Sequence, residues 1–173
     1  MRIKKQVEET FVKIFGGNAK FVSVTAPGRA NLIGEHVDYQ GGYVLPIAVD
    51  RFICGIGRKR SDNKIKLFSF NYNESFETTP AGISYNERVR WANYIMGVIQ
   101  EFKKLGYPIP GMEVVFGGDV PAGSGLSSSA AVEVCTAVLL EKLCSIKVDP
   151  IELIKLARRA ENEFVGVQCG IMD

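Results

Sequence analysis

The chain has 173 residues, of which 46% are hydrophobic and 23% are charged, and its formal net charge is +2. This length and composition suit one compact domain with a substantial core. The near balance of charge argues against a surface for polyanions, so we expect no nucleic-acid partner.

The chain begins with a charged segment that lacks the apolar core of a signal peptide. No apolar run reaches the roughly 18 residues that a membrane span needs. The four cysteines, at positions 54, 135, 144 and 169, show no Cys-x-x-Cys spacing, so we expect free thiols and neither a zinc site nor disulfides. Together these features favour a cytoplasmic protein without a membrane partner.

The first predicted element is a helix over residues 4–15, with Val7, Phe11 and Ile14 on one face and a glycine pair at its end. A strand over residues 21–26 follows, and Pro27-Gly28 is expected to end it. The next apolar strand is predicted over residues 43–49.

Residues 29–39, between these strands, carry a guanidinium, an amide, two carboxylates, a phenol and the only histidine of the chain. A solvated loop is one interpretation. A binding site is the other, because Leu32 and Ile33 are expected to anchor the segment to the core, and such a mixture of donors and acceptors suits hydroxyl-rich ligands such as sugars. A metal at His36 is the weaker hypothesis.

Strand-like patterns over residues 51–58 and 64–70 flank a polar turn and predict a hairpin, and residues 74–78 add a further strand. Residues 88–105 predict a helix with Ala92, Ile95, Ile99 and Phe102 on one face. Trp91 widens this face, and core packing is favoured for it over stacking on a base.

A strand over residues 111–118 leads into Pro121–Ala131, a glycine turn that ends in three consecutive serines and opens an apolar helix over residues 130–143. Such a helix start binds anions, because its first N–H groups lack partners and the helix dipole is positive there. The turn has neither the Lys of a Walker A loop nor the third glycine of a dinucleotide fingerprint. A serine-capped core helix is the alternative interpretation.

The last helix is predicted to begin with Asp149 as cap, Pro150 in the first turn and Glu152 three residues after the cap. Glu161 projects from the face that should be buried, where an ionised carboxylate needs a partner. Magnesium, held by Glu161 and a serine hydroxyl, is one possibility. A salt bridge to a Lys or Arg is the other, and spacing alone favours it.

Three segments resemble one family of enzymes. Residues 26–39 resemble the galactokinase signature, residues 121–131 resemble the phosphate-binding motif of the GHMP kinase superfamily, and residues 169–173 resemble the galactokinase active-site turn. The resemblance implies an α+β fold with a mixed sheet covered by helices. It also implies that residues 1–173 form the galactose- and ATP-binding N-terminal domain, with a second domain absent from this chain.

The family's activity is ATP-dependent phosphorylation of the anomeric hydroxyl of galactose, with ATP and Mg²⁺ required. By this resemblance Asp173 accepts the proton and Arg29 assists it. The sugar would be held by Glu35, His36, Asp38, Gly170 and Asp173. ATP would be bound by Ser69, Trp91, Gly123, Ser124, Gly125, Leu126, Ser127, Ser128 and Ser129, with Ser129 and Glu161 as magnesium ligands.

Two alternatives share these motifs: an N-acetylgalactosamine kinase, and a galactose-sensing regulator that binds both ligands without turnover. The intact serine turn disfavours the sensor. As a separate chain, the 173 residues are expected to have weak or no activity and to self-associate through an exposed apolar face.

Overall fold

A computed structural model of the protein describes residues 2–17, 19–34 and 36–173. Within these residues five strands form one mixed sheet in the order β1-β2-β5-β3-β4, and every neighbouring pair is antiparallel except β3 and β5. The strands are β1 (Val22–Asn31), β2 (Pro46–Lys59), β3 (Ile65–Ser69), β4 (Glu74–Thr78) and β5 (Met112–Gly118). The helices are α1 (Arg2–Phe15), α2 (Arg90–Lys104), α3 (Ser128–Cys144) and α4 (Pro150–Arg159), with a 3₁₀ turn η1 (Asp38–Gln40) and a π-helical turn η2 (Ala160–Val165). The predicted α+β class is confirmed.

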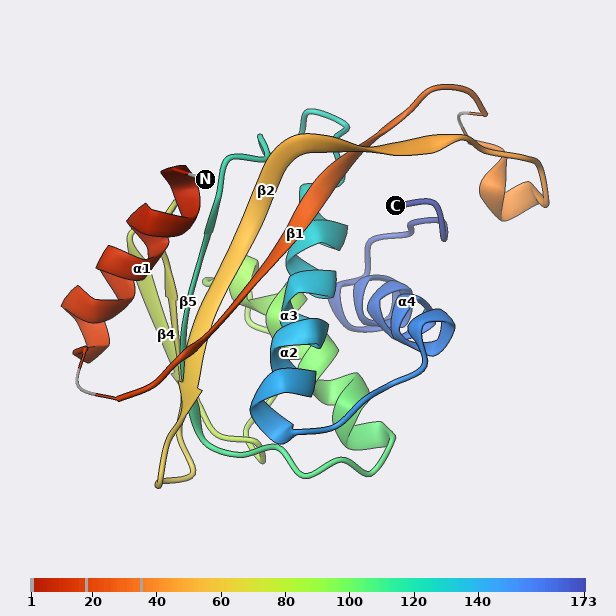
Figure 1. Cartoon of the computed structure of the whole chain (residues 1–173). Helices are drawn as coiled ribbons and strands as arrows, with labels where there is room; N and C mark the ends of the chain where they lie inside the picture. The colour runs from red at the N-terminus through yellow and green to blue at the C-terminus, as the bar shows by residue number, and fades with distance from the viewer. Residues whose placement is uncertain (1, 18, 35) are drawn as a thin grey trace.

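The sheet has a hydrophobic core on each face. Helix α1 covers one face, and α2 and α3 cover the other, with α4 packed against these two helices (Figure 1). Side chains alternate along a strand, so Val115 of β5 packs in the core under α1, whereas Val114 and Phe116 belong to the larger core under α2 and α3. Because every residue of β5 is buried, this strand forms the centre of the sheet.

The predicted helices are confirmed within a few residues at each end, with one wrong assignment in α1. Ile14 is exposed, and the buried stripe consists of Ile3, Val7 and Phe11, with Phe15 partly buried beside it. This stripe advances by four residues at each step, so Ile14 points away from the sheet.

The predicted hairpin between residues 51–58 and 64–70 is wrong. Strand β5 lies between β2 and β3, because Ile56 of β2 and Leu67 of β3 pair with opposite edges of β5, at Val115 and Val114 respectively. The N–H of Met112 donates to the carbonyl of Lys64 at 2.8 Å, so the start of β5 enters between the two strands. The turn residues 61–63 therefore connect two strands that are not adjacent.

Strand β1 continues through Pro27-Gly28, where the sequence predicted its end. Proline is tolerated because β1 is an edge strand of the sheet, and the register shifts between Pro27 and Arg29, as in a bulge. The two predicted strands over 43–49 and 51–58 are one strand, β2. Beyond the body of the sheet, β1 and β2 extend as a two-stranded arm that leads to η1 (Figure 1).

The arm is not anchored to the core as the sequence predicted. Leu32 and Ile33 are 60% and 65% exposed, and Tyr43 is 99% exposed. Backbone hydrogen bonds hold the arm instead, from Leu32 N to the carbonyl of Leu45 at 3.0 Å and from Leu45 N to the carbonyl of Ile33 at 3.1 Å. The loop at its tip is therefore positioned by strand pairing rather than by side-chain burial.

The predicted start of the last helix is correct for the cap. The Asp149 carboxylate accepts hydrogen bonds from the amides of Ile151 and Glu152, and Pro150 occupies the first helical position. The carboxylate of Glu152 pairs with Arg159 at 2.9 Å rather than completing a capping box. No helix among the described residues is long and apolar enough to cross a membrane.

Candidate functional site

The glycine side of the turn before α3 is exposed. Gly123 and Gly125 have φ values of 70° and 74°, and a Cβ added to either would meet no atom within 4 Å. Gly28 of β1 lies against the carbonyl of Leu126, to which Arg29 N donates at 3.1 Å. The turn is thus held on β1 while its glycine side and the N-terminus of α3 stay accessible to an anion.

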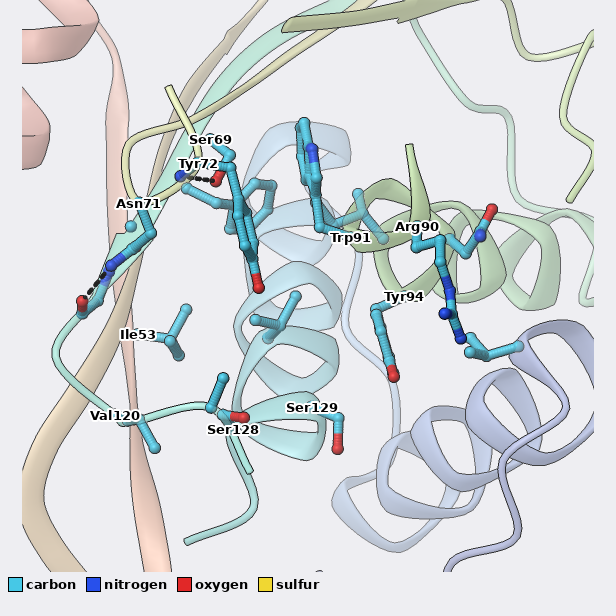
Figure 2. Close-up of a pocket in the computed structure, with 18 of the residues that line it drawn as sticks. Ile53, Ser69, Asn71, Tyr72, Arg90, Trp91, Tyr94, Val120, Ser128 and Ser129 are labelled. Carbon is cyan, nitrogen blue, oxygen red and sulfur yellow. Dashed lines mark hydrogen bonds between the residues drawn. The ribbon is translucent and has the colours of Figure 1, made fainter. Parts of the chain in front are cut away.

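A cleft of about 970 Å³ lies in front of this helix start, at the upper end of the range for small-molecule sites. Figure 2 shows Ser128 and Ser129 at the first turn of α3 and Tyr72 and Trp91 at the opposite end of the cleft. A phosphate chain at the serines and a planar ring near the aromatic side chains would fit this arrangement.

Two further predicted nucleotide-binding residues, Trp91 and Ser69, line this cleft. The indole of Trp91 is partly buried and donates through Nε1 to Glu74 Oε2 at 2.7 Å, so it is fixed against β4. Ser69 is buried, and its hydroxyl accepts from the amide of Tyr72 at 3.3 Å. Ser69 therefore stabilises the turn that leads to Tyr72, and among the described residues its hydroxyl proton is still free to donate.

A smaller hollow of about 280 Å³ adjoins the cleft. It is lined by Arg29, Ser127, Glu161 and Asp173, and it shares Gly123, Ser128, Ser129 and Glu161 with the larger cleft. Three segments that are distant in the sequence therefore meet beside the helix start, and they include the two predicted catalytic residues, Arg29 and Asp173.

Arg29 and Asp173 form a partly buried ion pair. Arg29 Nη2 donates to Asp173 Oδ1, and Arg29 Nη1 donates to the carbonyl of Gly125 at 2.9 Å. The hydroxyl of Ser127 donates to the same Oδ1 atom at 2.7 Å. The acid is thereby fixed to both β1 and the glycine-serine turn.

The tip of the arm contacts the final turn of the chain. Asp38 Oδ2 accepts from the amide of Met172 at 3.2 Å, and a Cβ on Gly170 would overlap the Asp38 carboxylate. His36 is exposed, has a φ of 57° and lies edge-on to the ring of Tyr39. Glu35 lies outside the described residues. The arrangement joins Asp38 and Gly170 directly, and it leaves the His36 ring on the surface of the loop.

Two buried carboxylates face each other behind the serines. Glu161, in the π-helical turn η2, is 3% exposed, and Glu133, in α3, is 1% exposed. Among the described residues neither carboxylate pairs with a Lys or Arg, and Glu161 Oε2 and Glu133 Oε1 have no hydrogen-bond partner. The salt bridge that spacing favoured for Glu161 is therefore absent among the described residues, and that prediction is wrong.

Burial, and next the charge of Glu161, raise the pKa of Glu133 to about 10. Glu133 is therefore neutral at pH 7 beside a second buried acid. Glu133 was not selected from the sequence, although it is the only acid in the apolar run over residues 130–140 and was therefore a usable signal. The pKa of the Cys169 thiol is also raised, mainly by burial and secondly by the nearby Glu161 carboxylate.

All four cysteines are free, as expected. Among the described residues no three His, Cys, Asp or Glu side chains form a metal-binding cluster, so the weaker hypothesis of a metal at His36 gains no support there. A cation bound at Glu161 would need serine, water or phosphate oxygens to complete its coordination.

Comparisons with known proteins agree on one family. Residues 9–59 match the galactokinase galactose-binding signature, and residues 93–173 match the N-terminal domain of GHMP kinases. The galactokinase of Clostridium tetani is 43% identical over 169 residues, which are 97% of this chain and 43% of that protein. The galactokinase of Bacillus subtilis is 41% identical over 174 residues, which are 99% of this chain and 45% of that protein.

The structural comparison gives the same result. A crystal structure of Lactococcus lactis galactokinase complexed with galactose matches with a TM-score of 0.93 and 38% identity, over 98% of this chain and 44% of that one. Methanococcus jannaschii mevalonate kinase, at 20% identity and a TM-score of 0.75 over 91% of this chain and 50% of that one, shares the fold. The chain spans less than half the length of the curated relatives it matches.

Proposed function

We propose that the chain forms the galactose- and ATP-binding part of an enzyme that phosphorylates the anomeric hydroxyl of galactose. The basis is that the chain belongs to the galactokinase family of the GHMP kinases. The proposal concerns the protein that carries this domain, because the matched relatives are longer. The observation that supports it most is the Arg29–Asp173 ion pair, which lies beside the open helix start.

ATP would bind with its phosphates at the N-terminus of α3 and its base toward Trp91. The backbone N–H groups of the turn and the hydroxyls of Ser128 and Ser129 supply donors, and the helix dipole favours negative charge at this place. Gly123 and Gly125 allow close approach because no side chain covers their backbone.

The residues behind the turn fit a magnesium ion. Mg²⁺ binds oxygen ligands, and the buried Glu161 Oε2 atom lacks a partner among the described residues while Ser129 lines the same hollow. Ser129 and Glu161 would hold the ion. When bound, Mg²⁺ neutralises charge on the phosphates of ATP.

Asp173 would accept the proton from the anomeric hydroxyl of galactose, and the contact with Arg29 keeps its carboxylate in place. Phosphoryl transfer passes through a loose transition state, so positioning and charge stabilisation supply most of the rate. Arg29 contributes a fixed positive charge next to the transfer site. Asp38 and Gly170, with Glu35 and His36 from the same loop, would hold the sugar.

The test uses the purified full protein with ATP, Mg²⁺ and a panel of sugars, and it measures sugar phosphate and ADP. We expect galactose 1-phosphate from the wild type. We expect Asp173→Asn to lose turnover by roughly 100-fold or more while ATP binding is retained. Asp50→Asn, an exposed aspartate on β2, is the matched control and should keep wild-type activity.

Three outcomes would contradict the proposal. Product from N-acetylgalactosamine and not from galactose would assign a different sugar. Binding of galactose and ATP without product would assign a sensor. Substantial activity of Asp173→Asn would show that Asp173 is not the base.

A further inference from the structure

We propose that Ser127 is a positioning residue for Asp173 and not a ligand of the ATP phosphates. Its hydroxyl holds one carboxylate oxygen of the acid and leaves the other oxygen for the substrate proton. This inference rests on the function proposed above, and it divides the serines of the turn into two roles.

The local structure does not use the Ser127 hydroxyl. Ser127 precedes the first turn of α3, where a serine ordinarily accepts a hydrogen bond from an amide of that turn. Here its backbone is left-handed, with φ 52° and ψ 51°, and its side chain makes no capping bond. Glycine adopts this conformation more readily than serine. Helix geometry alone therefore does not account for a serine at this position.

The contact with Asp173 does account for it. Ser127 Oγ lies 2.7 Å from Asp173 Oδ1, and Arg29 Nη2 donates to the same oxygen. Among the hydrogen bonds of the described residues, none involves Asp173 Oδ2. The two oxygens of the acid are thus distinguished, because Oδ1 receives two protein donors and Oδ2 remains available to accept a proton.

The neighbouring serines are placed differently. Ser128 and Ser129 line the large cleft that ends at Trp91, whereas Ser127 lines only the smaller hollow that contains Arg29 and Asp173. Ser124 donates to the carbonyl of Pro121 at 2.8 Å. Among the described serines of this turn, Ser127 alone contacts the acid.

A role in positioning links the acid to the phosphate site. Ser127 is the last residue before α3, so its hydrogen bond fixes Asp173 relative to the helix start at which the phosphates would lie. Arg29 provides the charge and reaches the same turn through the carbonyl of Gly125. Loss of the Ser127 hydroxyl should leave ATP binding intact and allow the Asp173 carboxylate to rotate.

The test compares Ser127→Gly with the wild type of the full protein. Glycine tolerates the left-handed backbone and removes the side chain together with its hydroxyl, so we expect kcat to fall by roughly tenfold or more while the Kd of ATP changes by less than about twofold. Ser127→Ala, which also lacks the hydroxyl, should show the same division between kcat and Kd. Ser145→Gly is the matched control, because Ser145 is also left-handed, at φ 57°, but lies exposed at the far end of α3.

The alternative role gives the opposite pattern. If Ser127 binds phosphate, both variants will raise the Kd of ATP, and that result would overturn the inference. An unchanged kcat in Ser127→Gly would also overturn it. An inactive wild-type protein would refute the proposed function and this inference together, whereas an active wild type with an unaffected Ser127→Gly variant would refute the inference alone.

Discussion

The buried Glu133 carboxyl should make the protein less stable as the pH rises, and Glu133→Gln should remove this dependence. Burial and the adjacent Glu161 raise the pKa of Glu133 from 4.5 to about 10. The folded protein therefore keeps this proton over a pH range in which the unfolded chain releases it. Glutamine has nearly the same shape, carries no charge and can donate a hydrogen bond to Glu161.

The magnitude follows from proton linkage. Because the folded pKa is raised, the contribution of Glu133 to stability is complete below the unfolded pKa of 4.5 and is lost as the pH rises toward about 10. Each pH unit in this window lowers the free energy of unfolding by about 1.4 kcal/mol. At pH 7 the loss relative to pH 4.5 is about 3 kcal/mol, and this figure requires only that the folded pKa lie well above 7.

The assay is urea denaturation at several values between pH 5 and pH 8, with EDTA present to remove divalent cations. We expect the stability of Glu133→Gln relative to wild type to increase by roughly 1.4 kcal/mol per pH unit. Glu87→Gln, an exposed acid with no ion pair among the described residues, should follow the wild type at all pH values. Parallel curves for Glu133→Gln and wild type would show that Glu133 is ionised in the folded protein, and the reasoning would be wrong.

Three further predictions concern the site, a helix cap and the core. Gly170→Ala places a Cβ on the Asp38 carboxylate and should weaken galactose binding by roughly tenfold or more in calorimetry; wild-type affinity would contradict the contact. Asp149→Ala removes the cap of α4 and should lower the free energy of unfolding by about 1 kcal/mol in urea. Phe11→Ala empties the centre of the core under α1 and should cost about 3–5 kcal/mol in the same assay, and a loss below that range would show that this core is loosely packed.

The helices could be predicted from the sequence because their signals are local. The buried face of α2, with Ala92, Ile95 and Ile99, follows from side-chain spacing alone. The burial of Glu161 was also predicted from spacing. Its missing partner could not be predicted, because that depends on which side chains the fold brings to the same place.

The order of the strands could not be predicted because strand pairing is decided between distant segments. The turn at residues 61–63 resembles that of a hairpin, yet β5 gains more by pairing with both β2 and β3 in the buried centre of the sheet. Pro27-Gly28 resembles a strand end for a similar reason, since proline breaks a central strand but is tolerated at an edge. Leu32 and Ile33 were wrongly predicted to be buried because the length of β1, which carries them into the exposed arm, was underestimated.

The roles of individual site residues came from the resemblance to a family, whereas local chemistry had already indicated the glycine-serine turn, the loop over residues 29–39 and the buried Glu161 as candidates. Glu133, which was not selected, and the contact of Ser127 with Asp173 both depend on partners in other segments of the chain. Ser127 was grouped with its neighbours because the three serines are adjacent in sequence, whereas in the structure it has a left-handed backbone and its hydroxyl donates to Asp173.

The Arg29–Asp173 ion pair joins residues that are 144 positions apart in the chain. Closing so long a loop costs entropy before the contact forms, so we expect this pair to assemble after the sheet during folding. Ligands that bind across the pair would then slow the rate of unfolding and leave the refolding rate nearly unchanged. If the pair forms this late, a ligand bound across it would prolong the lifetime of the native state rather than speed its formation.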